Sequence, residues 1–439
     1  MSGLNRRELL AGGGALALTA CGRATVSGKA GAGMIGDPFA GAKLMADVET
    51  YVGFGTHRTG SPGDLATSDW FETYWRGLGY ETEQTDVEAP NADTDIARLT
   101  TESGVLDGFA QPPLSFTSEA GITGKLARWN AASPDGVKGR IAYVSLPIDP
   151  IGITPAGAYR AAYQQAAAAG AIGVVAAMSG PSGEVVAINT PAGMTPGIPV
   201  LQFGDKLKPE LDEIADRGQD VTLTITGPGG TRVGLNTIAR FGAEGPWVVI
   251  STPQSGWFTC GGERGPGIAM SRALSAWAIR QDLPVRWLFV ATSGHEWYDL
   301  GAHIFHEHHA PPPAETALWW HLGAAFGARA HEMTPDGLVA KDTPNLVRAL
   351  MATPDLVPLI EASFAGHPVI GTPMPADVSQ ALGEYRLVLE NGYPSGAGFW
   401  GANAHFHTPF DGANATTPEI MEPILRAVAE VVEAKLRAI

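Results

Sequence analysis

Apolar runs that alternate with amphipathic segments predict an α/β domain. Runs typical of buried strands lie at residues 247–251, 286–292 and 317–321. An amphipathic segment at 267–281 separates the first two runs, and the segment from Thr417 onward places its apolar residues on one stripe of a helix. Alternating strands and helices predict a mostly parallel mixed sheet with helices on both faces. Ligands and chemistry are then expected at the edge where the strands' carboxyl ends meet.

A second, smaller pattern begins near Gly121. One alanine-rich helix, at about 156–169, accompanies four short apolar runs. These runs lie at 140–146, 171–177, 198–203 and 221–226. Because this stretch holds no combination of His, Cys and carboxylates, we expect residues 121–227 to form an inserted, non-catalytic α/β module. The main domain is then expected to comprise residues 41–120 and 228–439.

The first residues are typical of an export signal. Arg6-Arg7 precedes a weakly apolar run and resembles a twin-arginine (Tat) signal, and residues 18–21 (Leu-Thr-Ala-Cys) resemble a lipoprotein cleavage box. The run is too short to span a bilayer. We therefore predict a signal at residues 1–21, a flexible tether at 22–40 and a lipid anchor on Cys21. The protein would face the periplasm or the cell exterior.

Composition narrows the class of partner and the redox chemistry. The chain has 439 residues, enough for two domains, and its formal charge of −16 argues against nucleic-acid binding. After Cys21, Cys260 is the one remaining cysteine. The mature chain therefore cannot form an internal disulfide.

Metal-capable side chains occur at predicted strand ends and loops of the main domain. The pair His295-Glu296 directly follows the strand-like run 286–292 and a Ser-Gly turn. Four positions can bind metal: Glu263, Glu296, His321 and His407. Two carboxylates and two imidazoles are ligands that suit Zn²⁺.

Four motifs, in this order, resemble a known family. They are residues 57–63 (His-Arg-Thr-Gly-Ser-Pro-Gly), 262–267 (Gly-Glu-Arg-Gly-Pro-Gly), 293–296 (Ser-Gly-His-Glu) and 407–411 (His-Thr-Pro-Phe-Asp). Together they resemble the co-catalytic zinc exopeptidases, the family of bacterial leucyl aminopeptidase, glutamate carboxypeptidase, glutaminyl cyclase and transferrin receptor. The inserted module resembles a protease-associated domain.

The chain departs from that family at the metal site. The family's His-x-Asp metal motif reads Thr-Pro-Gln at residues 252–254. By the resemblance, Glu263 replaces the metal-bridging Asp, His295 replaces the general-base Glu, and His321 replaces an Asp ligand. These changes imply one metal ion rather than two.

The resemblance then implies a specific site and activity. One zinc ion would be held by Glu263, Glu296 and His407, with His321 in or next to the shell. His295 would serve as general base, although a purely structural role fits the sequence equally well. The implied activity is metal-dependent hydrolysis of a peptide, amide or related acyl bond. Two alternatives stay open: a catalytically inactive, peptidase-like binding lipoprotein, and single-zinc acyl transfer of the glutaminyl-cyclase kind.

Overall fold

The protein is described from a computed structural model that covers residues 36–150, 152–335 and 337–438. The predicted signal and the predicted lipidation site at Cys21 lie outside the described residues. Within the described residues, none of the helices combines the length and apolar character needed to cross a bilayer.

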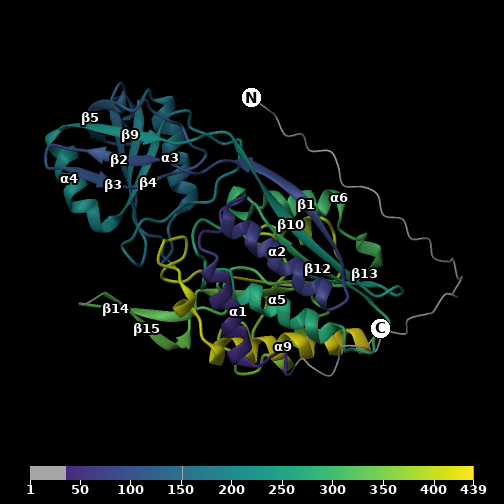
Figure 1. Cartoon of the computed structure of the whole chain (residues 1–439). Coiled ribbons are helices and arrows are strands. Elements are labelled where there is room, and N and C mark those ends of the chain that lie inside the picture. Colours follow the sequence, from purple (N-terminus) through teal and green to yellow (C-terminus); the bar gives the residue numbers. More distant parts are fainter. Residues whose placement is uncertain (1–35, 151, 336, 439) are drawn as a thin grey trace, which may run out of the picture. The chain divides into compact units, whose positions relative to one another are not determined.

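The main domain is built on an eight-stranded mixed sheet with the order β1-β10-β12-β11-β13-β18-β16-β17. Figure 1 labels β1, β10, β12 and β13 of this sheet. The strands are β1 (Glu81–Pro90), β10 (Thr231–Phe241), β11 (Trp247–Pro253), β12 (Arg286–Thr292), β13 (Thr316–His321), β16 (Arg348–Ala352), β17 (Met374–Pro375) and β18 (Gly396–Gly401). The four neighbours β12, β11, β13 and β18 run parallel, whereas β1, β10 and β16 pair antiparallel. The predicted α/β fold with a mostly parallel core is confirmed.

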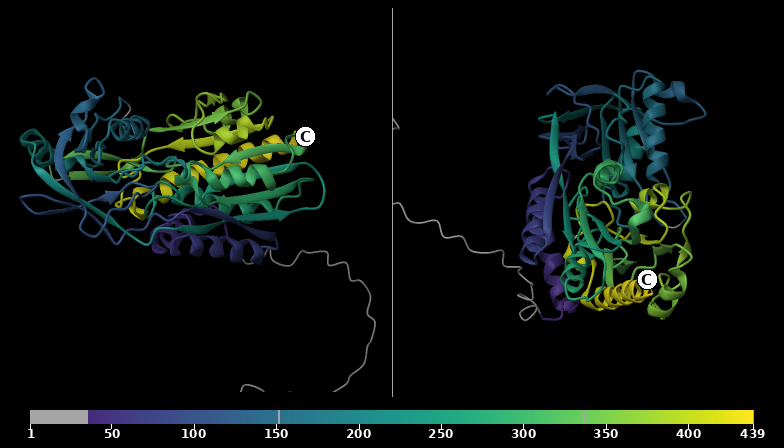
Figure 2. Two further views of the ribbon diagram at one scale, coloured as in Figure 1. Left: turned by 90° about the horizontal axis from the view of Figure 1, so that it is seen from above. Right: turned by 90° about the vertical axis from the view of Figure 1, so that its right-hand side faces the viewer.

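Side chains that alternate along the central strands are buried on both faces of this sheet. On β11, Val248 and Ile250 belong to one buried cluster, while Val249 belongs to another. The first cluster packs under α1 (Gly41–Gly53), α2 (Pro62–Gly77), α5 (Gly265–Ala278), α7 (Val357–Ser363) and α9 (Pro418–Arg437). The second packs under α6 (Leu300–His308) and α8 (Tyr385–Glu390). Helices α1 and α9 lie against each other, as the purple and yellow helices in Figure 2 show.

Local sequence explains where α2 begins. Ser61 is its N-cap, and its hydroxyl accepts a hydrogen bond from the backbone N–H of Asp64. Pro62 occupies the first helical position, where the missing N–H is not needed. The predicted turn at 57–63 is therefore the entry to α2, and it approaches the strand-end site described below.

A second eight-stranded sheet has the order β3-β2-β9-β5-β6-β7-β8-β4. Its strands are β2 (Ile96–Thr100), β3 (Val105–Asp107), β4 (Phe109–Ala110), β5 (Ile122–Arg128), β6 (Ile141–Ser145), β7 (Gly173–Met178), β8 (Val200–Gly204) and β9 (Asp220–Thr226), with helices α3 (Ala156–Ala168) and α4 (Lys208–Arg217). This module begins at Ile96, upstream of the boundary expected at residue 121. The pairing of Ile96 with Thr226 explains the difference, because such long-range register leaves no local sequence signal. A hairpin of β14 (Arg329–Thr334) and β15 (Gly337–Pro344) completes the strands.

Candidate functional site

The carboxyl ends of β11, β12 and β13 meet at one edge of the main sheet, because these strands are parallel neighbours. Residues 254–255 follow β11, the turn 293–296 follows β12, and His321 is the last residue of β13. The loop before α5 brings Glu263 and Arg264 to the same region. The strand-end position expected from the sequence is therefore where most of the buried charged residues lie.

Two glycines allow the loop before α5 to approach the chain near Asp411. A Cβ on Gly261 would lie 2.3 Å from the backbone of Gly412, and one on Gly262 would lie 2.8 Å from Asp411 Oδ1. Asp411 accepts hydrogen bonds from the backbone N–H groups of Gly262 (3.0 Å) and Glu263 (2.9 Å). Burial, together with the nearby charge of Glu263, raises the pKa of Asp411 to about 7. The sequence Gly-Gly-Glu thus fixes the Glu263 side chain in the site.

Glu263, Arg264 and His407 form the first of two charged clusters. Arg264 Nη2 lies 2.7 Å from Glu263 Oε1, and both side chains are 1% exposed. His407 Nε2 lies 3.1 Å from the same Glu263 oxygen. Arg264 Nε donates to the carbonyl oxygen of Ser255 at 3.0 Å. Burial pushes the pKa of Glu263 upward, but Arg264 and His407 outweigh it and lower the pKa to about 2. Glu263 is therefore a carboxylate at neutral pH.

His295, Asp299 and Glu384 form the second charged cluster. His295 Nδ1 lies 3.0 Å from Asp299 Oδ1 and 3.2 Å from Glu384 Oε1. Glu384 also accepts hydrogen bonds from Thr292 Oγ1 at 2.9 and 2.8 Å. Burial and the charge of Arg264 lower the pKa of His295, but the two carboxylates outweigh them and raise it to about 9.

This charge state bears on the role predicted for His295. An imidazole with a pKa near 9 is protonated at neutral pH, so it donates a proton and cannot accept one. The general-base role of His295 stays a prediction. Sequence reasoning did not identify its partners Asp299 and Glu384. Asp299 is four residues after His295 and could have been noticed as an acidic neighbour, whereas Glu384 is brought in by the fold from a distant loop.

Glu296 connects the site to the turn before α2. Its Oε1 accepts hydrogen bonds from the backbone N–H (2.6 Å) and the hydroxyl (2.7 Å) of Thr59. Its Oε2 accepts one from Ser255 Oγ at 2.7 Å. Both carboxylate oxygens thus have protein partners, and the predicted opening turn at 57–63 is tied to the strand ends by this side chain.

His321 is a buried, neutral histidine. Its Nδ1 lies 2.9 Å from Ser251 Oγ, which in turn accepts a hydrogen bond from Trp319 Nε1 at 2.8 Å. Burial, reinforced by the charge on His295, lowers the pKa of His321 to about 3. Ser251 Oγ thus joins the rings of Trp319 and His321 through hydrogen bonds.

The position of the missing His-x-Asp motif holds an amide network. Gln254 Nε2 donates to Asp64 Oδ1 at 2.9 Å and lies 2.6 Å from Ser68 Oγ. Asp64 Oδ2 accepts a hydrogen bond from Ser293 Oγ at 2.7 Å. Burial raises the pKa of Asp64 to about 7. This network joins α2 to the ends of β11 and β12, and it occupies the position where the resemblance predicts a His-x-Asp motif.

The four residues predicted to bind zinc are near the same edge but do not converge. Zinc sites in proteins use three or four nitrogen, oxygen or sulfur donors about 2.0–2.3 Å from the ion. Among the described residues, the one trio of such donors within 4.8 Å of one another is His295, Asp299 and Glu384. Glu263 and His407 are in contact, whereas Glu296 and His321 are held by hydroxyl partners. As placed, the predicted set does not fit a zinc ion, and the ligand assignment stays a prediction.

Backbone strain is concentrated in these loops. Cys260, Tyr298, Asp299 and His407 have positive φ angles of 52°, 65°, 66° and 60°. Left-handed backbone is unfavourable for residues with a side chain and tends to persist where function requires a particular geometry. The strain supports a functional role for the strand ends, in addition to their buried charge.

One loop of the second module contacts the site. His407 Nδ1 lies 2.9 Å from the carbonyl oxygen of Ala187, and the N–H of Ala187 donates to His407 O at 3.0 Å. Trp257 Nε1 donates to Asn189 Oδ1 at 2.9 Å, and the N–H of Thr190 donates to Glu296 O at 3.1 Å. A cavity of about 150 Å³ beside this loop is lined by Ile153, Thr154, Ala156, Pro181, Val186, Ala187, Ile188, Asn403, Phe406 and His407.

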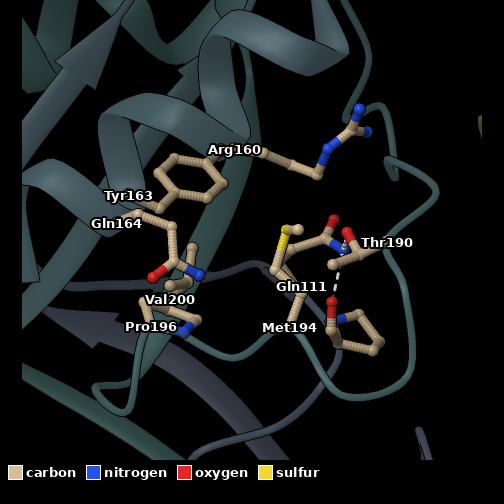
Figure 3. Close-up of a pocket in the computed structure, with 9 residues that line it drawn as sticks. Gln111, Arg160, Tyr163, Gln164, Thr190, Met194, Pro196 and Val200 are labelled. Carbon is tan, nitrogen blue, oxygen red and sulfur yellow. Dashed lines mark hydrogen bonds between the residues drawn. The ribbon is translucent and has the colours of Figure 1, made fainter.

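A separate, small pocket of about 20 Å³ lies in the second module (Figure 3). In it, Arg160 extends toward the loop that bears Thr190, and its Nη1 donates to Asn189 O at 2.5 Å. Gln111 Nε2 donates to the carbonyl oxygens of Pro112 and Ile188. These contacts hold the loop at 187–190, which contacts the site.

Comparison with known proteins gives a consistent fold. No family model matches the sequence, and no curated protein matches it. The structure is similar to an aminopeptidase from Aneurinibacillus sp. strain AM-1 (15% identity, 90% of this chain and 93% of that chain, TM-score 0.62). It is also similar to the zinc aminopeptidase BSAP from Bacillus subtilis (14% identity, 91% of this chain and 96% of that chain, TM-score 0.68). A third similar structure is a peptidase M28 precursor from Shewanella amazonensis (16% identity, 90% of this chain and 96% of that chain, TM-score 0.66). This chain therefore has the fold of these aminopeptidases and of the M28 peptidase precursor.

Proposed function

We propose that this chain is a peptidase-like hydrolase that acts on a peptide, amide or related acyl bond at the strand-end site. The observation that carries the proposal is the buried set of opposite charges on Glu263, Arg264 and His295. Fixed cations in a water-poor site can stabilise the oxyanion that develops during acyl transfer. The aminopeptidase-like fold supports a peptide or amide as the substrate class.

The sequence implied a single zinc ion held by Glu263, Glu296 and His407. Zinc would polarise a carbonyl and activate water. Because the predicted ligands do not converge, we assign no catalytic step to zinc. The roles that follow from the chain itself are an anionic carboxylate on Glu263 and proton donors on Arg264 and His295.

Turnover by the purified full chain tests the proposal. A panel of aminoacyl p-nitroanilides and short peptides should yield products that chromatography resolves, and Glu263→Gln should abolish most of that turnover. Glu332→Gln, at an exposed residue paired with Lys341, is the matched control and should keep it. Absence of product with every member of the panel would contradict hydrolysis.

A second candidate function is binding without turnover. It is favoured by the burial of the site, since Glu263, Arg264, Glu296 and His321 are all at most 2% exposed. A substrate would need a local opening to reach them. Calorimetric binding of the same peptides, with no product after prolonged incubation, would support a binding protein on this fold.

Export and anchoring belong to the same proposal. We propose that the chain leaves the cytoplasm through the Tat system and is held at the membrane by a lipid on Cys21, with the second module acting as a protease-associated domain. A Cys21→Ser variant should move from the membrane fraction to the soluble fraction with its folded domains intact. A wild-type protein that is already soluble and unmodified at Cys21 would contradict the anchor.

A further inference from the structure

The side chain of Arg264 is a buried cation in an unusual place. It is the N-cap residue of α5, where the partial positive charge of the helix N-terminus disfavours another cation. Arg264 is nevertheless 1% exposed, and its guanidinium extends to Glu263 Oε1 and the carbonyl oxygen of Ser255. Helix stability therefore does not explain an arginine at this position.

The guanidinium lies among groups associated with the metal site. Its charge acts on Glu263, His295 and His321, which stand where the resemblance puts the bridging acid, the base and a metal ligand. Glu384 and Cys260 also interact with it electrostatically. A positive charge is thus already fixed in contact with Glu263, one of the residues predicted to bind zinc.

Two charged atoms of this region have no hydrogen-bond partner among the described residues. Glu263 Oε2 and Arg264 Nη1 are both buried without a hydrogen-bond partner. A lone buried carboxylate is unstable unless a cation accompanies it, and Arg264 supplies that cation to the other Glu263 oxygen. The free Nη1 hydrogens could donate to a ligand oxygen, as an open coordination position of a metal would accept one.

The loss of the His-x-Asp motif is consistent with this arrangement. Thr252 and Gln254 are uncharged, so the edge has lost an anionic residue that would help to hold a second metal. A zinc ion beside a fixed guanidinium would experience like-charge repulsion in a poorly solvated site. The uncharged residues at 252–254 and the charge of Arg264 therefore both disfavour zinc binding at this edge.

We propose that the guanidinium of Arg264 takes the place of a zinc ion, so that the strand-end site binds its ligand without a metal. The inference rests on the proposed location of the functional site but not on turnover. It accounts for the uncharged residues at 252–254, the retained carboxylate of Glu263 and the protein partners of Glu296.

Metal content tests the proposal directly. The full chain, incubated with zinc chloride and desalted, should retain far less than one zinc per chain by inductively coupled plasma mass spectrometry. Its thermal midpoint should be unchanged by EDTA. Stoichiometric zinc in the wild type, removed by EDTA with a loss of stability, would overturn the proposal.

Variants of Arg264 sharpen the test. Arg264→Asn removes the cation and frees Glu263 and His407, so it should retain more zinc than the wild type and be stabilised by added zinc. Arg264→Lys keeps the charge and should retain none. Arg272→Asn is the matched control, because Arg272 is another buried arginine of α5, lying 3.3 Å from Asp47 and outside the site.

The outcomes separate this inference from the proposed function. A folded Arg264→Asn variant that gains no zinc would contradict the substitution of metal by guanidinium. If that variant does not fold, the zinc content of the wild type still decides. Turnover without zinc supports both proposals, turnover that requires zinc overturns only this one, and a zinc-free protein without turnover overturns only the hydrolase.

Discussion

The two eight-stranded sheets of this chain differ in how deeply their ion pairs are buried. At the strand ends of the main sheet, Glu263 and Arg264 form an ion pair in which both side chains are 1% exposed. In the second sheet, Arg128 of β5 pairs with Asp212 and Asp216 at 2.8 and 2.7 Å, but its side chain is 43% exposed. Both modules are α/β, yet only the first places paired charges at its strand ends and away from water among the described residues.

The difference favours the strand ends of the main sheet as the functional region. Moving an ion pair out of water carries a desolvation penalty that mutual attraction often fails to offset, so such a pair adds little stability as a whole. Surface pairs avoid that penalty and contribute little in either direction. A buried pair is therefore more informative about function than an exposed one, and the second sheet is best understood as a scaffold whose loop at 187–190 touches the site.

Removing one partner from each pair should give the largest contrast. Arg264→Met leaves the Glu263 carboxylate buried without its cation, and we expect a loss of about 3–5 kcal/mol in the free energy of unfolding. Arg128→Met should change that free energy by about 1 kcal/mol or less. Denaturant unfolding of both variants at neutral pH measures the difference. Equal losses would mean that the buried pair has no special electrostatic role.

Activity should also distinguish the strand-end site from the surface of the same domain. If hydrolysis occurs, His295→Ala should lower kcat by about 10²–10⁴-fold, because a proton donor fixed by two carboxylates is removed. His308→Ala, at an exposed histidine of α6, should leave kcat unchanged. Steady-state kinetics with the best substrate of the panel gives the comparison. An unchanged kcat in His295→Ala would make this histidine structural.

Much of the fold could be predicted from the sequence because it is encoded locally. The runs at 247–251, 286–292 and 317–321 are strands β11, β12 and β13, and their parallel order places chemistry at one edge. The start of the second module was placed too late, at 121 rather than 96. Its first strand, β2, pairs with β9 across more than a hundred residues, and such pairing depends on the folded chain.

The candidate site could be located but not fully understood from the sequence. The loop at 262–267 and the turn at 293–296 lie at the predicted edge, yet Arg264 was treated as part of a motif and not as a participant. Its role depends on the direction of a long side chain, which spacing does not reveal. Glu384 joins His295 only through the folding of a distant loop. Whether zinc binds any of these residues stays a prediction.

The charge on His295 predicts a pH dependence of stability. Its pKa is raised from 6.5 to about 9 in the folded protein, so its stabilising contribution is complete below pH 6.5 and is lost as pH rises through 9. The contribution is at most about 3 kcal/mol, at roughly 1.4 kcal/mol per pKa unit. The free energy of unfolding should therefore fall between pH 6.5 and 9.5, and the fall should be smaller in His295→Gln. Asp64 and Asp411, with pKa values near 7, add to the slope only at the lower end of this range.

The smallest expected effect concerns the contact between the two modules. Asn189→Ala removes the acceptor for Trp257 Nε1, whose indole is 1% exposed, and leaves that donor buried without its partner. We expect a loss of about 1–2 kcal/mol in the free energy of unfolding, because an unsatisfied buried donor carries most of its desolvation penalty. Asn130→Ala, at an exposed turn of the same module, should change it by about 0.5 kcal/mol or less. A loss in Asn189→Ala together with altered peptide binding or turnover would show that the loop at 187–190 takes part in the site. A loss of stability alone would restrict the second module to supporting the fold.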